Sequence, residues 1–140
     1  MKKTYFVALF SFVIFGLICA NSFAGEAEKD ALNAAGEWLA LVDAGDYGGS
    51  WDAAADLSKK AVTKEMWAQS IKAVRSAMGD LISRSVKSAQ YTTSLPGAPD
   101  GEYVVIQFSA SFTNKKSATE TVTPMKDPDG KWRVSGYYLK

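Results

Sequence analysis

The sequence YVVIQFSASF, which runs from Tyr103 to Phe112, decides the fold of this chain. Every even-numbered residue in it is apolar, whereas the odd-numbered residues of its second half, beginning with Gln107, are polar. Successive side chains of a β-strand point to opposite faces of a sheet. The alternation therefore predicts a strand that packs one face against a core and leaves the other face in water.

Three further segments around this strand have the composition of strands. They span residues 81–94, 118–125 and 131–139. The connections between the four segments are short, and they contain turn-forming proline, glycine, asparagine and aspartate residues. Parallel neighbours need a long crossover connection, so strands joined this closely run antiparallel. We expect a curved four-stranded antiparallel sheet.

The residues before Gly79 show helical periodicity instead. Apolar residues recur at spacings of three and four from about residue 27 to residue 44, and again between Thr63 and Gly79. The stripe of the latter helix consists of Trp67, Ile71, Val74 and Met78. Thr63 is suited to cap its start and Gly79 to end it, and Ser50 can cap a short helix between the two. The predicted fold class is α+β, with three N-terminal helices packed on one face of the curved sheet.

The first 24 residues have the features of a cleaved signal peptide. Lys2 and Lys3 precede an apolar run over residues 5–20, and the small residues Ser22 and Ala24 stand at the positions that a signal peptidase reads. We expect cleavage after Ala24, and hence an exported protein that is periplasmic or secreted. A membrane anchor is the alternative, but the apolar run is shorter than the roughly 20 residues of a spanning helix.

The chain contains no histidine, and its one cysteine, Cys19, lies within the predicted signal peptide. A lipoprotein is disfavoured because Ile18 is too large for the residue that precedes a lipidated cysteine. Residues 25–140 thus lack the side chains that most readily serve as a general base, a thiolate nucleophile or a zinc ligand, and they cannot form a disulfide. We predict no catalytic residue, no metal and no cofactor.

Removal of residues 1–24 leaves 116 of the 140 residues, and it takes away two of the 16 basic residues and none of the 15 acidic ones. This length supports one domain with one core. The nearly balanced charge provides no field that would attract nucleic acid or an anionic membrane surface. We predict a single α+β domain over residues 25–140, with no nucleic acid as partner and no membrane after cleavage.

Two loops resemble ligand-binding motifs, but each lacks part of the pattern. The sequence DPDG at residues 127–130 resembles the start of a calcium loop, yet it has a proline at the second position and no distal glutamate. We predict a hairpin turn there. The three glycines within residues 45–49 follow a helix rather than a strand, so they indicate a turn and not a phosphate-binding loop.

Arg84 and Glu120 form the candidate polar site. Strand alternation places both on the sheet face that Ile106 also lines. Two opposite charges on a buried face can form a hydrogen-bonded ion pair that fixes register, or they can make the floor of a pocket in which a carboxylate acts as acid or base. Leu81, Ala89 and Tyr91 have the opposite parity to Arg84, so either Arg84 lies on the other face of the sheet or a β-bulge reconciles the two sets.

Trp51 and Tyr137 complete the set of candidate pocket residues. The tryptophans before Gly79 lie on helix stripes, where large aromatic residues are typical of a core. Trp51 belongs to a short alanine-rich segment with few large neighbours, which favours a place at the mouth of a cavity. Tyr137, close to the end of the last strand, is placed to supply a hydroxyl group.

Several blocks of the sequence occur together. They are AGEWLALVDAGDYGGSW at residues 35–51, Val62 and Thr63 with Trp67, Arg75, Ser83 and Arg84, LPGAPDGEY at 95–103, ETVTPM at 120–125 and GKWRVSGYY at 130–138. In this combination the chain resembles a family of small exported bacterial proteins, catalogued as domain of unknown function 4019, over essentially all of residues 25–140. That resemblance implies no activity. The order of helices and sheet also resembles the cone of the nuclear transport factor two and cystatin-like folds, which implies shape and not chemistry.

Two classes of function follow. The first is a non-catalytic exported module that binds a small apolar ligand or a peptide in the cone, or that forms a homodimer through the wet sheet face of Tyr103, Gln107, Ser109 and Ser111. The second is an enzyme of isomerase, dehydratase or hydrolase type that uses Glu120 and Arg84. Enzymes on the cone that this chain resembles commonly use an Asp–His pair, which a chain without histidine lacks, so we favour the first class.

Overall fold

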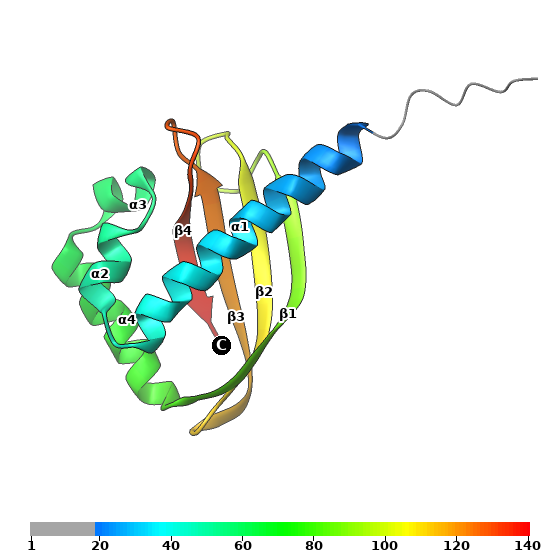
Figure 1. The fold of residues 1–140 in the computed structure, drawn as a ribbon. Helices are drawn as coiled ribbons and strands as arrows, with labels where there is room; N and C mark the ends of the chain where they lie inside the picture. Colours follow the sequence, from blue (N-terminus) through cyan, green and yellow to red (C-terminus); the bar gives the residue numbers. More distant parts are fainter. Residues whose placement is uncertain (1–18) are drawn as a thin grey trace, which may run out of the picture.

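The computed structural model describes residues 19–140, with side chains described from residue 25 onward. Four helices come first and four strands follow (Figure 1). Their bounds are α1 (Cys19–Asp43), α2 (Tyr47–Asp52), α3 (Asp56–Ala61), α4 (Lys64–Met78), β1 (Leu81–Thr92), β2 (Tyr103–Phe112), β3 (Lys115–Lys126) and β4 (Trp132–Leu139). The predicted signal peptide, residues 1–24, lies outside the described residues apart from the backbone of its last six, which begin α1. None of the described helices is long and apolar enough to cross a membrane.

The four strands form one antiparallel sheet in the order β1-β2-β3-β4. The sheet is curved and unclosed, and α1 runs diagonally across one of its faces in contact with all four strands (Figure 1). Helix α2 packs against α4 beside the β4 edge, and α3 contacts β4 itself. The predicted α+β class with an antiparallel meander is therefore confirmed.

The short helix predicted from Ser50 onward is divided into two, so that residues 19–140 form four helices instead of the three predicted. Ser50 does not cap α2, because Asp46 does so by accepting a hydrogen bond from the Gly49 N–H at 2.9 Å. The chain then turns at Ala55, whose backbone is extended and whose N–H donates to the carbonyl of Val134 on β4 at 2.8 Å. This hydrogen bond to the sheet edge interrupts the helix, and the local sequence contains no signal that predicts the interruption.

Helix α3 also covers the outer edge of β4. In addition to the Ala55 N–H, the Ser58 hydroxyl donates to the next carbonyl along the edge, that of Ser135, at 2.7 Å. Edge strands carry unpaired backbone N–H and C=O groups, to which another strand can form hydrogen bonds. Here two successive carbonyls of β4 are already hydrogen-bonded.

The ends of α4 follow the prediction. The Thr63 hydroxyl accepts from the Met66 N–H at 3.2 Å at the start, and Gly79 follows the last residue with a φ of 79°, a value that favours glycine. The apolar stripe, however, is shifted: Val74 is 37 % exposed, whereas Arg75, one residue on, is only 6 % exposed. A charged residue thus occupies a core-facing position of this helix.

Two register shifts in β1 reconcile the conflicting parities of its residues. One lies between Leu81 and Ser83 and the other between Val86 and Ser88. Arg84 pairs with Ala110, while Ala89 pairs with Ile106, and both partners face the core. The alternative with a β-bulge is therefore the correct one, and it brings Arg84 and Ala89 to the same face of the sheet.

The β2–β3 connection is tighter than predicted, because the turn falls at Thr113 and Asn114 and β3 already begins at Lys115. The prediction that Tyr103 lies on a wet face is wrong. Tyr103 is 1 % exposed, and its hydroxyl donates to the carbonyl of Pro99 at 2.6 Å. The loop before β2 folds back over this side chain and buries it.

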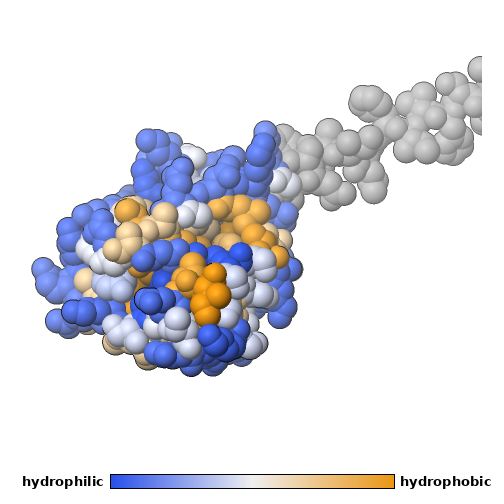
Figure 2. Space-filling view, turned by 60° about the horizontal axis from the view of Figure 1, so that its bottom comes forward, coloured by the Kyte–Doolittle hydropathy of each residue, from blue (hydrophilic) through white to orange (hydrophobic). Residues whose placement is uncertain are grey.

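The core lies between α1 and the sheet. Its main cluster combines residues of α1, α4 and the strands, and a smaller cluster of Ala110, Phe112 and Ala118 lies toward the β2–β3 turn. Figure 2, in which the lower end of the view in Figure 1 comes forward, shows separate hydrophobic patches surrounded by hydrophilic residues.

Candidate functional site

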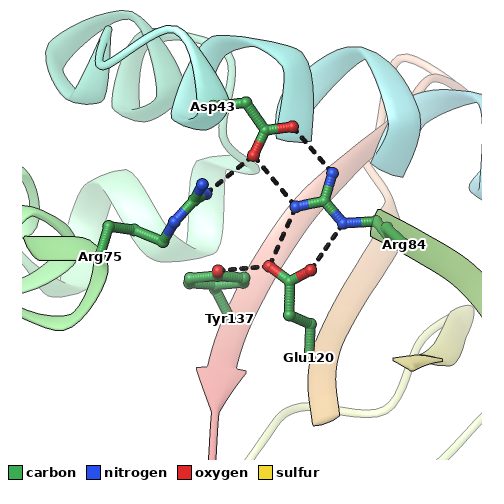
Figure 3. Close-up of polar contacts among 5 residues, drawn as sticks. All are labelled: Asp43, Arg75, Arg84, Glu120 and Tyr137. Carbon is green, nitrogen blue, oxygen red and sulfur yellow. Dashed lines mark hydrogen bonds and ion pairs between the residues drawn. The ribbon is translucent and has the colours of Figure 1, made fainter. Parts of the chain in front are cut away.

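Glu120 on β3 is completely buried, with 0 % of its surface exposed. Its carboxylate accepts from Arg84 Nε at 2.6 Å and Nη2 at 3.2 Å, and from the Tyr137 hydroxyl at 2.6 Å (Figure 3). Burying a carboxylate is costly unless it is paired and hydrogen-bonded. Three donors, two of them from a cation, meet that requirement here.

Arg84 is shared between two carboxylates. While its Nε and Nη2 face Glu120, its Nη1 and Nη2 donate to Asp43, the last residue of α1, at 2.8 and 3.0 Å. Attraction to both acids outweighs the effect of burial, so the pKa of Arg84 lies above its ordinary value. The guanidinium therefore joins the end of α1 to the sheet.

Asp43 also accepts from Arg75 Nη1 of α4 at 2.9 Å. Partial burial alone would raise the pKa of Asp43, but hydrogen bonds and charge attraction from Arg84 and Arg75 lower it overall. The guanidinium of Arg75 lies over the ring of Phe112 at 5.2 Å from the ring centre. The five residues Asp43, Arg75, Arg84, Glu120 and Tyr137 make one network of two cations, two anions and a phenol (Figure 3).

Tyr137 connects this network to an aromatic group. Its ring lies 5.1 Å from that of Trp38, which in turn stands edge-on to Trp67 at 6.2 Å. Burial, followed by the negative charge of Glu120, raises the pKa of Tyr137 above its ordinary value of 10.0. The hydroxyl is therefore a hydrogen-bond donor to Glu120 and not a base. These aromatic rings fill the space between α1, α4 and the sheet.

A pocket of about 290 Å³ opens beside this aromatic group, between α3, α4 and β4. Its lining residues are Ser58, Ala61, Val62, Met66, Trp67, Ser70, Ile71, Ser135 and Tyr137. No charged side chain of residues 25–140 is among them. Met66 is 58 % exposed at this site, although it is a large apolar residue. Glu120 does not line this pocket, because Tyr137 lies between them.

Trp51 lies apart from the other candidate residues. Its indole N–H donates to the carbonyl of Val62 at 3.1 Å, and the residue lines an open groove of about 540 Å³ together with Lys59 and Lys64. The structure thus brings Arg84, Glu120 and Tyr137 together and leaves Trp51 on another surface. Asp43 and Arg75 belong to the network but were not among the candidates.

A second hollow, of about 670 Å³, lies where α1 and α4 end, and Asp43 and Arg75 line it. Asp43 and Arg75 already neutralise each other through their 2.9 Å contact, and Asp80 is a third charged residue of the wall. The hollow is polar and has no unpaired charge from this network to offer a ligand.

The predicted hairpin turn at residues 127–130 is confirmed, with Gly130 at a φ of 81°. Arg133 donates to Asp127 and to both carboxylate oxygens of Asp129, at 2.8 to 2.9 Å. Hydrogen bonds from Arg133, followed by the Lys131 N–H, lower the pKa of Asp129 to about 2. An arginine side chain thus stands where a cation bound to these two acids would be. In the described part of the chain, no three histidine, cysteine, aspartate or glutamate residues group as metal ligands would.

Comparison with known proteins gives one match. The sequence model of a family described as protein of unknown function (DUF4019) matches residues 34–137. The matched range contains all five network residues and every residue that lines the 290 Å³ pocket. No curated protein and no solved structure shows significant similarity to this chain.

Proposed function

Because this chain belongs to the family of proteins of unknown function DUF4019, whose description names no activity, we propose a function from the geometry of the site. The protein is a non-catalytic exported module, periplasmic or secreted, that binds a small apolar ligand, or an apolar side chain of a peptide, in the pocket between α3, α4 and β4. Export is supported by the basic, apolar and small-residue segments of residues 1–24. Helices laid across a curved, open sheet are compatible with a cone of the nuclear transport factor two or cystatin-like kind.

The observation that carries this proposal is the composition of the pocket wall. Small-molecule sites are concave and mostly apolar, with a few polar groups that orient the ligand. This pocket has that character, since Trp67, Ile71 and Val62 provide apolar area and serine hydroxyls stand among them. Exposed methionine is typical of surfaces that adapt to apolar ligands, and Met66 stands at this pocket.

The alternative of an enzyme that uses Glu120 and Arg84 has less support. A catalytic acid or base must come within hydrogen-bonding distance of its substrate. Glu120 has no exposed surface, and its carboxylate already accepts three hydrogen bonds. Aromatic side chains occupy the space above it. We therefore assign Glu120 and Arg84 to the support of the fold.

The proposal can be tested with methyl-labelled protein and two small probes, toluene and indole. Titration should shift the methyl signals of Met66 and Ile71, which line the pocket, and leave that of Met78 unchanged. Ser70→Trp should abolish the shifts by filling the pocket. Gln69→Trp, at an exposed neighbour outside the lining, is the matched control. If neither probe shifts Met66 and Ile71 at millimolar concentration, the pocket does not bind apolar ligands.

A second candidate, homodimerisation through the outer face of the sheet, is favoured by the absence of charge in its central row. Ser88, Gln107, Thr121 and Tyr138 form this row across the strands, whereas the next row, Ser85, Ser109 and Thr119, ends at Lys140 beside Thr119. Two copies of such a face meet without like-charge repulsion. Tyr138, which is exposed, is of a residue type enriched at interfaces.

Light scattering of the protein across a wide concentration range tests this candidate. Thr121→Lys would place two like charges at a two-fold contact, so we expect it to yield a monomer, while Ser76→Lys on the exposed side of α4 leaves the dimer intact. A wild-type protein that stays monomeric at millimolar concentration would exclude the dimer.

A further inference from the structure

We infer that the pocket between α3, α4 and β4 selects neutral ligands that carry an O–H or N–H donor on an apolar body, such as a phenol or an indole, and discriminates against anions. This inference rests on the proposed function, since it specifies the chemistry of the ligand for the same pocket. The inference follows from the hydrogen-bond partners of the side-chain donors that line the pocket.

The three serine hydroxyls of the wall all donate to backbone carbonyls. Ser58 donates to Ser135 at 2.7 Å, Ser135 to Thr123 at 2.8 Å, and Ser70 to Met66 at 2.8 Å. A carbonyl oxygen has no hydrogen to give, so each hydroxyl must be the donor in its contact. None of the three has a second hydrogen for a ligand.

The two remaining donors of the wall are also engaged. The indole N–H of Trp67 donates to the Ser50 hydroxyl at 3.0 Å, and the Tyr137 hydroxyl donates to Glu120 at 2.6 Å. The raised pKa of Tyr137 agrees with a proton held firmly on that oxygen. Every side-chain donor that lines the pocket is therefore committed to the protein itself.

What remains for a ligand is a set of acceptors. Each serine oxygen keeps lone pairs after donating, because a hydroxyl has one hydrogen and two lone pairs. An O–H or N–H group on the ligand can use them. A carboxylate would instead bring negative charge to a wall of oxygen lone pairs that, among residues 25–140, includes no cation. Leaving such a group unpaired and desolvated is unfavourable.

The size of the pocket sets the size of the ligand. A cavity of about 150 Å³ suffices for benzene, and sites for drug-sized molecules begin near 300 Å³. At about 290 Å³, this pocket suits one substituted ring or a bicyclic indole. The same chemistry occurs in free phenols and indoles and in the side chains of tyrosine and tryptophan.

Four ligands that share one ring test the inference: 4-methylphenol, 4-methylanisole, toluene and 4-methylbenzoate. We expect 4-methylphenol to bind about tenfold more tightly than 4-methylanisole or toluene, as one net hydrogen bond predicts, and 4-methylbenzoate to bind most weakly. Dissociation constants come from the Met66 and Ile71 methyl shifts. Equal affinities for the phenol and its methyl ether, or tightest binding of the benzoate, would overturn the inference and leave apolar binding intact. Failure of all four to bind would overturn the proposed function as well.

Single alanine variants assign the accepting oxygen. Ser58→Ala, Ser70→Ala and Ser135→Ala each remove one acceptor. In the variant that lost the oxygen bonded to the ligand, the ratio of the dissociation constants of 4-methylanisole and 4-methylphenol should fall to about one. Thermal unfolding verifies that each variant is folded. A preference that persists in all three would contradict the role of the serine hydroxyls. A parallel comparison of N-acetyl-tyrosinamide with 4-methylphenol distinguishes the two sources: tighter binding of the amide indicates a peptide side chain, and tighter binding of the phenol indicates a free small molecule.

Discussion

Arg84 on β1 reaches across β2 to contact Glu120 on β3, with its Nε 2.6 Å from a carboxylate oxygen of a side chain that has no exposed surface. The same guanidinium holds Asp43 at the end of α1. Three elements that are distant in sequence therefore depend on one side chain for their relative positions. Removal of one member of a buried pair leaves an uncompensated charge, which is more damaging than the loss of the contact itself.

Glu120→Gln should destabilise the protein by about 3 kcal/mol, because it removes the charge that compensates Arg84 inside the sheet. Urea unfolding followed by tryptophan fluorescence measures the change. Glu37→Gln, on the exposed side of α1, should change stability by less than about 0.5 kcal/mol. Wild-type stability of Glu120→Gln would show that the network does not support the fold.

Tyr137→Phe should destabilise the protein by about 1.5–3 kcal/mol at neutral pH, since a hydrogen bond to a charged group is lost. The raised pKa of Tyr137 adds a pH dependence. The folded state favours the protonated phenol, so its contribution is present below about pH 10 and is lost as pH rises beyond that value. Unfolding free energies between pH 8 and pH 11 should fall less steeply in Tyr137→Phe than in wild type. Tyr138→Phe, at the exposed neighbour, should retain the wild-type slope.

Asp43→Asn should make the free energy of unfolding less dependent on pH under acidic conditions. The pKa of Asp43 lies below its ordinary value of 3.8, so its contribution is present above about pH 4 and is lost as pH falls through the folded-state value. We expect the variant to lose about 2 kcal/mol at pH 7 and to show a shallower decline between pH 5 and pH 3. Asp100→Asn in the exposed β1–β2 loop is the control. An unchanged decline in Asp43→Asn would exclude Asp43 as its source.

Gly79→Ala should destabilise the protein more than Gly97→Ala. Both glycines have positive φ angles, 79° and 77°, which alanine tolerates poorly. A methyl group at residue 79 would also collide with the Thr113 hydroxyl, whereas no atom of the described residues lies within 4 Å of a methyl group at residue 97. We expect a loss of about 1 kcal/mol for Gly97→Ala and clearly more for Gly79→Ala. Equal melting temperatures of the two variants would contradict the close approach of Thr113.

The periodic features of the fold could be predicted from the sequence because they repeat over many residues. The alternation of β2 is of this kind, while the caps of α4 at Thr63 and Gly79 could be predicted from the residue types that favour helix ends. The division between α2 and α3 could not be predicted, because it depends on a hydrogen bond from Ala55 to a strand 79 positions further along the chain. Tyr103 was misplaced for a similar reason, since a folded loop covers a face that alternation alone leaves open.

Three of the five residues of the polar network, Arg84, Glu120 and Tyr137, could be predicted as well. Strand alternation, which placed two charges on the packed face of the sheet, pointed to Arg84 and Glu120. A signal for Arg75 was also present, because it follows Ile71 by four residues on the buried stripe of α4, where an apolar residue is normal. Asp43 gave no such signal: an acidic residue at the end of a helix is unremarkable until its partners are known.

The attachment of α3 to β4 has a consequence for assembly in concentrated solution. A sheet can recruit further strands without limit only if both of its borders accept them, as in a fibril. Two successive carbonyls on the β4 border are taken by Ala55 and Ser58, so this part of the border cannot accept a further strand. Pairing through the β1 border alone permits a finite closed pair of molecules but no endless ribbon.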